Sequence, residues 1–348
     1  MNEMQIRLPK GFDAHCHFRT GEMLTAIGGL IAKHWSKAVA MPNTVPPIET
    51  ANDAEKYRKE IIDACGGNFE PIMTIMLTKK TTPQIVKEAA RRGVKALKYI
   101  PRGVSTNSEE SISLGELPDF YNVLDAVQEA GMIFSGHWEL LRDKNGELAE
   151  MEREESAIVF LNKIVRHFPG LKTIVEHASS RHMIDYVKQC PLNVKATLTI
   201  HHAIIVNDDV YDKHGRIYNP HNYCKPVAKR TADAEAVFSA MTSGDHRFFF
   251  GSDNAPHLLS AKKKTPPPAG IFNPFTLPIL CFIFETCNTL DNLKGFITAG
   301  EKIYGLTPSH ETVTLVKEDQ VIPESYPCGN DVIVPFMAGR TIPWKVAE

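Results

Sequence analysis

Short apolar segments alternate with longer amphipathic segments along nearly the whole chain. Eight of the short segments are rich in apolar, β-branched and aromatic residues, which is typical of buried strands. These eight predicted strands cover residues 11–18, 37–43, 70–77, 94–100, 132–139, 172–179, 194–202 and 247–257. The alternation of strand-like and helix-like segments predicts parallel strands that are connected by helical crossovers.

The longer segments carry the end signals of helices. Several of them begin near Ser, Thr or Asp and end at a glycine, as at Gly93, Gly131 and Gly170. Such residues satisfy the free backbone groups at helix starts and allow the backbone to turn at helix ends. The clearest predicted helices cover residues 53–65, 82–93, 117–131 and 157–168.

Eight strand–helix units are the number that closes a barrel of parallel strands. Such a barrel takes roughly 250 residues before insertions, which fits a chain of 348 residues. We therefore predict an α/β fold, a (β/α)8 TIM barrel, as one domain over residues 1–348. An open doubly wound sheet is the alternative, but no GxGxxG motif follows the first strand. The short β-like segments from about residue 312 to 348 predict a short C-terminal β-containing extension that packs on the barrel.

Composition and charge exclude several classes of partner. The 39 Lys+Arg and 41 Asp+Glu give a net charge of −2, so we expect no nucleic acid and no membrane surface as partner. No apolar stretch is long enough to span a bilayer. The 7 cysteines form no CxxC pair and no signal peptide is apparent, which predicts a cytoplasmic protein. A homodimer is compatible with the sequence, which does not determine the assembly.

Histidines and one carboxylate stand at the ends of four predicted strands. His15 and His17 end the first strand, where residues two apart share one face. His137 ends the fifth strand, His177 the sixth and Asp253 the eighth. Functional residues of such barrels gather at the C-terminal ends of the strands, so we expect these side chains in one mouth. Imidazole and carboxylate ligands together suit Zn²⁺ or a similar divalent ion.

A lysine also stands at this predicted mouth. Lys98 lies nearer the end of the fourth strand than Lys95 and is therefore the better candidate. A charged ammonium would repel metal ions, whereas a neutral amine can add CO₂ to become a carbamate, an anion able to bridge two ions. A solvated lysine at a strand end is the alternative interpretation.

Two segments resemble the signatures of the dihydroorotases, a family of the amidohydrolase superfamily. DAHCHFR at 13–19 resembles the first signature, and GSDNAPH at 251–257 with the following Lys262 resembles the second. The length and motifs resemble the compact, monofunctional bacterial type. The resemblance runs over nearly the whole chain and also includes MPN (41–43), LKYIP around Lys98, STNS (105–108), GHWE, VEHASS, NPHNYCKP (219–226), PAGIFN (268–273) and VPFMAGR (334–340).

The resemblance implies two Zn²⁺ per subunit. Lys98 would carry a carbamate derived from CO₂ and would be an N6-carboxylysine. The ligands of the first ion would be His15, His17, Lys98 and Asp253, and those of the second would be Lys98, His137 and His177.

The resemblance also implies a reaction on a small molecule, the interconversion of N-carbamoyl-L-aspartate and (S)-dihydroorotate in UMP synthesis. A hydroxide that bridges the two ions would attack the ring amide, and Asp253 would serve as general acid and base. A loop over residues 101–113 would close as a lid through Ser105 and Thr106. Among the implied substrate-binding residues, Arg19, Asn43 and His257 would hold the substrate carboxylate, and the backbone around Asn222 and Ala269 would contact the ring.

Two positions depart from the family pattern. Cys16 replaces the aliphatic residue that is usual between the two histidines, and strand alternation predicts that it points away from the metals. Trp138 follows His137 where a small residue is commoner, and it could narrow or reshape the mouth.

Other functions on the same fold are alternatives. A hydantoinase or allantoinase would use the same metal chemistry, but Arg19 with Asn43 favours a ring that bears a carboxylate. A catalytically inactive relative would be expected to lack a metal ligand, and every predicted ligand is present. His201 and His202 either support the metal ligands or are ordinary polar residues near the barrel rim.

Overall fold

Eight parallel strands form the central sheet of the computed structural model, which describes residues 4–347. Every strand pair in this sheet is parallel, and each strand lies within one of the eight predicted segments. In spatial order the strands are β2 (Phe12–Cys16), β3 (Lys37–Ala40), β4 (Glu70–Met76), β5 (Ala96–Tyr99), β6 (Ile133–Gly136), β9 (Lys172–Val175), β10 (Val194–Leu198) and β11 (Phe248–Phe250).

Backbone contacts just beyond the first and last strands close this sheet. The backbone N–H of Asp253 donates to the carbonyl oxygen of His15 over 2.9 Å. The buried carboxylate of Asp13 accepts from the backbone N–H groups of His15 and Ser252, at 3.1 and 2.8 Å. The predicted TIM barrel is thus confirmed, and the open doubly wound sheet does not occur.

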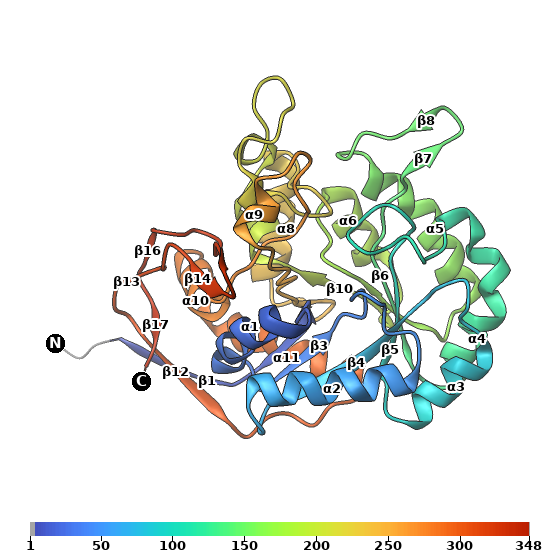
Figure 1. Cartoon of the computed structure of the whole chain (residues 1–348), viewed down its shortest axis with the longest axis horizontal. Coiled ribbons are helices and arrows are strands. Elements are labelled where there is room, and N and C mark those ends of the chain that lie inside the picture. Colours follow the sequence, from blue (N-terminus) through green and yellow to red (C-terminus); the bar gives the residue numbers. More distant parts are fainter. Residues whose placement is uncertain (1–3, 348) are drawn as a thin grey trace.

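Helices surround the strands on the outside of the barrel (Figure 1). Within residues 4–347, no helix combines the length and the apolar character that a membrane crossing needs. The predicted helix over 117–131 is divided, because Pro118 lies in the 3₁₀ helix η1 (Leu114–Phe120) and α4 begins only at Tyr121. The helices are α1 (Gly21–His34), α2 (Ala51–Cys65), α3 (Pro83–Arg91), α4 (Tyr121–Glu129), α5 (Arg153–His167), α6 (Arg181–Gln189), α7 (Ile200–Ile204), α8 (Thr231–Thr242), α9 (Leu259–Lys262), α10 (Thr276–Thr286) and α11 (Leu290–Tyr304), with 3₁₀ turns η2 (Asn207–Asp209) and η3 (Pro220–Asn222).

The strand predicted over 194–202 is wrong in its last part. β10 ends at Leu198, and the Thr199 hydroxyl accepts from the backbone N–H of His202 to cap the short helix α7. A threonine that caps a helix satisfies a free backbone donor, which favours the turn over further extension. His201 and His202 therefore lie on a helix and not at a strand end.

Apolar side chains fill the interior of the barrel below its mouth. Helix α11 closes the bottom, where Tyr304 packs edge-on against Phe12 with ring centroids 5.3 Å apart. Gly300 of α11 lies against this floor, since a Cβ atom there would meet Phe249 and Phe12 at 2.8 and 2.9 Å. The buried interior cluster consists of Phe12, Ala14, Val39, Met41, Ile72, Ala96, Ile133, Ile174, Phe249, Ile303 and Tyr304.

Short antiparallel strands form the C-terminal extension, as predicted. The strand β12 (Thr312–Val316) pairs with β1 (Gln5–Pro9) and with β17 (Lys345–Val346), which brings the two ends of the described chain together (Figure 1). The remaining pairs are β13 (Gln320–Val321) with β16 (Thr341–Ile342) and β14 (Tyr326–Cys328) with β15 (Asp331–Ile333). The strand β14 contacts α1 and β15 contacts α9, so the extension packs on the barrel helices. One further hairpin, β7 (Arg142–Asp143) with β8 (Gly146–Glu147), lies between β6 and α5.

The barrel floor gives a stability prediction. Gly300→Ala should lower the free energy of unfolding by about 1–3 kcal/mol, because the added methyl group overlaps two packed rings. The matched control is Gly29→Ala in α1, where an added Cβ atom meets nothing within 4 Å. This substitution should stabilise the helix by about 0.5–1 kcal/mol. Urea denaturation of both variants measures the difference. Equal unfolding free energies for the two variants would contradict this packing.

Candidate active site

Three predicted metal ligands converge at the point where the barrel closes. The Nε2 atoms of His15 and His17 lie 3.3 Å apart, and each lies close to Oδ1 of Asp253, at 3.3 and 3.1 Å respectively. All three side chains are buried or nearly so. Two imidazole nitrogens and one carboxylate oxygen at these separations form one face of a metal site.

A second pair of ligands lies across the same mouth. Nδ1 of His137 and Nε2 of His177 are 3.2 Å apart, and both rings are buried. The ring of His177 also lies against that of His15, with centroids 5.0 Å apart. The structure therefore brings all four predicted histidines and Asp253 to one end of the barrel.

Lys98 places a buried amine in this mouth. Its side chain is 1% exposed, and no hydrogen-bond partner for Nζ occurs among the described residues. Burial lowers the pKa of Lys98 to about 8, although the nearby carboxylates of Glu176 and Asp253 favour its charged form. An amine with this pKa is neutral in about a tenth of the molecules at pH 7, far more than a lysine with the ordinary pKa.

Two buried glutamates orient the histidines, and the sequence analysis missed both. Oε2 of Glu176 lies 2.7 Å from Nδ1 of His15, and Oε2 of Glu139 lies 2.6 Å from Nε2 of His137. Each carboxylate fixes one ring nitrogen as the donor and leaves the other nitrogen free to bind a metal. Burial opposes ionisation of Glu176, but His15 and Lys98 hold the pKa of Glu176 at about 2. The available signal was a carboxylate within two residues of a candidate ligand, in VEH and HWE.

Three residues of the site have unusual backbone conformations. Arg19, His177 and Asp253 have φ angles of 58°, 41° and 47°, in the left-handed region that non-glycine residues seldom adopt. Strain of this kind persists only where surrounding contacts impose it, and it is frequent at functional sites. Here it turns each side chain at or beyond a strand end toward the mouth.

One cavity at the mouth of the barrel joins these residues. Asn222, whose backbone is predicted to contact the substrate ring, is not among the lining residues, and its side-chain amide donates to the carbonyl oxygen of Asp209 over 3.3 Å. Lys225, three residues later, lies on the cavity wall instead, and the sequence analysis did not select it. The lining residues are His15, His17, Arg19, Asn43, Lys98, Ile100, Ser105, Thr106, His137, His177, Lys225, Asp253, Ala255, Ala269 and Gly270.

Comparisons with known proteins identify the family to which the chain belongs. A scan against models of protein families finds no match. A curated dihydroorotase of Pseudomonas syringae pv. tomato is 34% identical over 353 residues, covering 99% of both chains. The crystal structure of dihydroorotase from Saccharomyces cerevisiae in complex with 5-fluoroorotic acid matches with a TM-score of 0.92 at 34% identity, covering 99% of this chain and 98% of that chain. The chain belongs to the dihydroorotase family.

More distant relatives share only the fold. An L-hydantoinase from Arthrobacter aurescens matches with a TM-score of 0.79 and covers 98% of this chain and 83% of its own, but it is only 14% identical. The same barrel therefore extends beyond the dihydroorotase family, and the choice between functions depends on the side chains of the cavity.

Polar groups that the dihydroorotase resemblance assigns to the substrate carboxylate gather on one side of the cavity. Nη2 of Arg19 lies 3.2 Å from Nε2 of His257, and Nε of Arg19 donates to the carbonyl oxygen of Pro256 over 3.1 Å. Burial and the charge of Arg19 lower the pKa of His257 to about 2, so this imidazole is neutral. Both hydrogen-bond partners of the Arg19 guanidinium are thus uncharged, so its positive charge is available to bind an anion. The side-chain oxygen of Asn43 is buried there without a partner among the described residues.

The predicted lid loop is held against the cavity. Nδ2 of Asn43 donates to the carbonyl oxygen of Thr106 over 3.0 Å, and the Asn107 amide donates back to the carbonyl oxygen of Asn43 over 2.9 Å. The Thr106 hydroxyl lies 3.5 Å from the carbonyl oxygen of Ala269 on the opposite wall. These contacts connect the loop to two sides of the cavity mouth.

Lys262, the last residue of the second dihydroorotase signature, connects two segments of the wall. Its buried Nζ donates to the carbonyl oxygens of Pro220, Tyr223, Pro268 and Gly270, at 2.8, 3.3, 3.1 and 2.5 Å. One ammonium therefore fixes the segment before Lys225 to the segment that contains Ala269. No structural role is predicted for Lys262 from the sequence.

The two departures from the dihydroorotase pattern lie outside the cavity lining. Cys16 is buried in the core between strands and helices, as predicted from strand alternation. Trp138 is 1% exposed and packs edge-on against Tyr99 and Phe134, with ring centroids 5.9 and 6.0 Å away. Gly136 leaves space for this indole, since a Cβ atom at Gly136 would meet Nε1 of Trp138 at 2.6 Å. The tryptophan therefore packs beside the barrel and does not narrow the mouth.

Proposed function

We propose that this protein is a zinc-dependent dihydroorotase that interconverts N-carbamoyl-L-aspartate and (S)-dihydroorotate in pyrimidine synthesis. The observation that carries the proposal is the unpartnered amine of Lys98 between two groups of converging metal-ligand atoms. Full-length relatives that bear the name dihydroorotase support the choice of reaction. Seven free cysteines fit a reducing compartment, so we also propose a cytoplasmic location.

The donor set fits two divalent ions. Burial lowers the pKa of His15, His17 and His177, which keeps these rings in the neutral form that binds metals. When bound, two Zn²⁺ ions would polarise a carbonyl group and lower the pKa of a water molecule toward neutrality. The residues that would hold the first ion are His15, His17, Lys98 and Asp253, and those that would hold the second are Lys98, His137 and His177.

The modification of Lys98 explains how an amine can serve as a metal ligand. Neutral Nζ forms a bond to the carbon of CO₂ and releases one proton to solvent, which leaves a carbamate of charge −1. The change replaces a cation by an anion at the centre of the mouth and supplies two oxygen ligands. The pKa of Lys98 near 8 provides the neutral amine that this addition needs.

The other residues of the cavity would bind and orient the substrate. Arg19 can form a bidentate pair with the substrate carboxylate, and Asn43 lines the same cavity, whereas His257 contacts Arg19 without lining the cavity itself. The backbone around Ala269 and Asn222 would contact the ring, and Lys225 lies on the cavity wall nearby. In hydrolysis Asp253 would accept a proton from the attacking water and deliver it to the departing ring nitrogen.

The proposed reaction can be measured directly. Zinc-loaded protein should turn over dihydroorotate, with hydantoin and allantoin much poorer, because Arg19 and its neighbours complement a carboxylate that these two rings lack. Loss of the ultraviolet absorption of dihydroorotate reports the rate, and the same assay is run on the two rival substrates. Faster turnover of hydantoin or allantoin would replace this proposal by the corresponding activity.

A pair of lysine variants tests the ligand role of Lys98. Lys98→Met should lose both metal ions and all turnover, because it removes the only group that would bind both ions. Lys95→Met is the matched control on the same β-strand segment, and it should keep full metal content and activity. Elemental analysis after dialysis gives the ion content. Normal zinc content in Lys98→Met would exclude the bridging role.

Substitution at the loop tests its role as a lid. Thr106→Ala should lower kcat about tenfold, or roughly 1.4 kcal/mol, because the loop loses its hydroxyl contact with the opposite wall. Glu109→Ala, an exposed position on the same loop, serves as the control and should leave kcat unchanged. If steady-state kinetics of the two variants are alike, the loop does not act through Thr106.

A further inference from the structure

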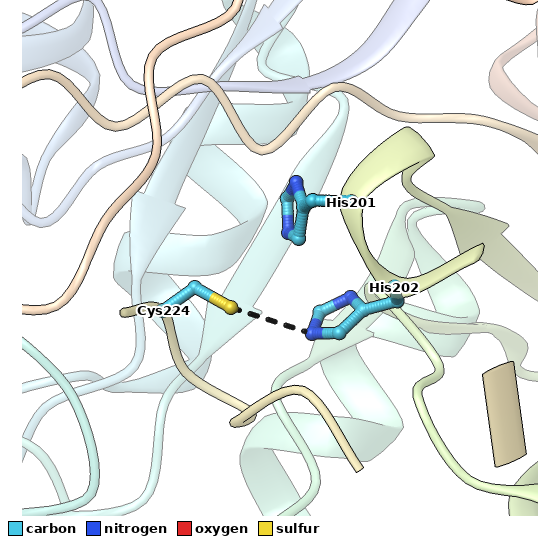
Figure 2. Close-up of side chains that lie close together, drawn as sticks. All are labelled: His201, His202 and Cys224. Carbon is cyan, nitrogen blue, oxygen red and sulfur yellow. Dashed lines mark hydrogen bonds between the residues drawn. The ribbon is translucent and has the colours of Figure 1, made fainter. Parts of the chain in front are cut away.

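A third group of metal-ligating side chains lies beside the proposed binuclear site and shares no residue with it. His201 and His202 come from α7, and Cys224 follows η3 in the wall segment that leads to Lys225. One ligand atom from each of the three lies within 4.8 Å of the other two. Figure 2 shows the two imidazole rings and the sulfur atom facing one another.

All three side chains are buried, at 2%, 2% and 1% exposure for His201, His202 and Cys224. Nε2 of His201 has no hydrogen-bond partner among residues 4–347. A buried imidazole nitrogen without a partner is costly, since it has lost its water and gained nothing in exchange. Burial lowers the pKa of both histidines, that of His202 to about 4, so both rings are neutral.

The hydrogen bonds of His202 orient its ring toward Cys224. Nδ1 lies 2.9 Å from the Thr199 hydroxyl oxygen, and Nε2 lies 3.6 Å from Sγ of Cys224. When Nδ1–H donates to Thr199, the lone pair of Nε2 is directed at the space beside the sulfur. A metal-ligating histidine commonly has its other ring nitrogen held by such a partner.

We propose that His201, His202 and Cys224 form a third metal site, which binds one Zn²⁺ ion with a water molecule in the fourth position. One thiolate and two imidazoles are the ligand types that zinc prefers, and three protein ligands leave one tetrahedral position open. Binding removes the thiol proton of Cys224 to solvent, so the ion and its ligands carry a charge of +1. Burial and the carboxylates of Asp253 and Glu139 raise the pKa of the Cys224 thiol, whereas Lys262 and Lys225 favour the thiolate that the ion needs.

The position of the site suggests what the ion does. It would connect α7, which follows β10, to the segment that precedes Lys225 on the cavity wall. The wall segment over residues 220–224 would then be held at both ends. The ion would bind Cys224 at one end, and the Lys262 ammonium donates to the carbonyl oxygen of Pro220 at the other. The proposed ion would therefore fix the position of the cavity wall.

The competing account is a cluster held by hydrogen bonds alone. The carbonyl oxygen of Pro226 lies 2.8 Å from Nε2 of His202 and 3.2 Å from Sγ of Cys224, so both groups can donate to it. In that case His202 and Cys224 are satisfied without an ion, and only His201 lacks a partner. The two accounts differ in whether the thiol is ionised and bound.

Cobalt substitution distinguishes them, because only a sulfur ligand gives a thiolate-to-metal charge-transfer band in the near ultraviolet. Metal-depleted full-length protein is titrated with Co²⁺ in wild-type form and as the Cys224→Ser and His201→Gln variants. Cys328→Ser removes a buried cysteine of the extension and is the matched control. Circular dichroism shows that each variant is folded. Since His201 has an unpartnered nitrogen, His201→Gln remains a usable test if Cys224→Ser does not fold.

The proposal predicts three bound ions and a charge-transfer band in the wild-type protein and in Cys328→Ser. Cys224→Ser should abolish the band and lower the binding from three ions to two, and His201→Gln should weaken or abolish the band. No band in the wild-type protein, or a band that survives in Cys224→Ser, would overturn it. The band depends on sulfur and on none of the binuclear ligands, so failure of the proposed dihydroorotase function would leave this result unaffected.

Discussion

The arrangement of the barrel mouth depends on the burial of an amine among groups that bind metals. Lys98 is buried without a hydrogen-bond partner in the described chain, while four imidazoles, Asp253 and Glu176 surround it. An uncompensated buried ammonium costs several kcal/mol, and its charge also repels any metal ion placed beside it. In the proposed function, carboxylation of the amine followed by metal binding would remove both costs at once. The site would then be completed by its ions and by CO₂.

Some of the residues that close the barrel also form the site. The residues that join the first strand to the last, Asp13, His15 and Asp253, bring two metal ligands to the seam of the barrel. Left-handed backbone conformations at His177 and Asp253 turn their side chains into the mouth. These conformations are strained, and the packing of the core must offset the free energy of that strain. The apolar floor around Phe12 and Tyr304 supplies a rigid base for these strained ends. The apolar residues that stabilise the fold lie below the mouth of the barrel, and the residues with proposed chemical roles lie at the strand ends.

Sequence reasoning predicted the elements whose pattern is local. All eight strands were located, because each is a short buried run, and the barrel rule placed the histidines and Asp253 at their ends in one mouth. The strand over 194–202 was too long, since the pattern of apolar residues continues through the cap of a one-turn helix. Glu176 and Glu139 act through contacts that appear only after folding. Lys225 was missed because a loop without regular structure gives no periodicity from which to infer which side chain faces the cavity.

The central claim is that Lys98, as a carbamate, joins two ions held by the surrounding histidines and Asp253. A crystal structure of zinc-loaded protein grown with bicarbonate, with anomalous diffraction at the zinc edge, tests this directly. The account predicts two ions in the barrel mouth and continuous density from Nζ of Lys98 to a carboxylate group that contacts both. An unmodified Lys98 amine beside fully bound zinc, or ions bound away from these ligands, would contradict it.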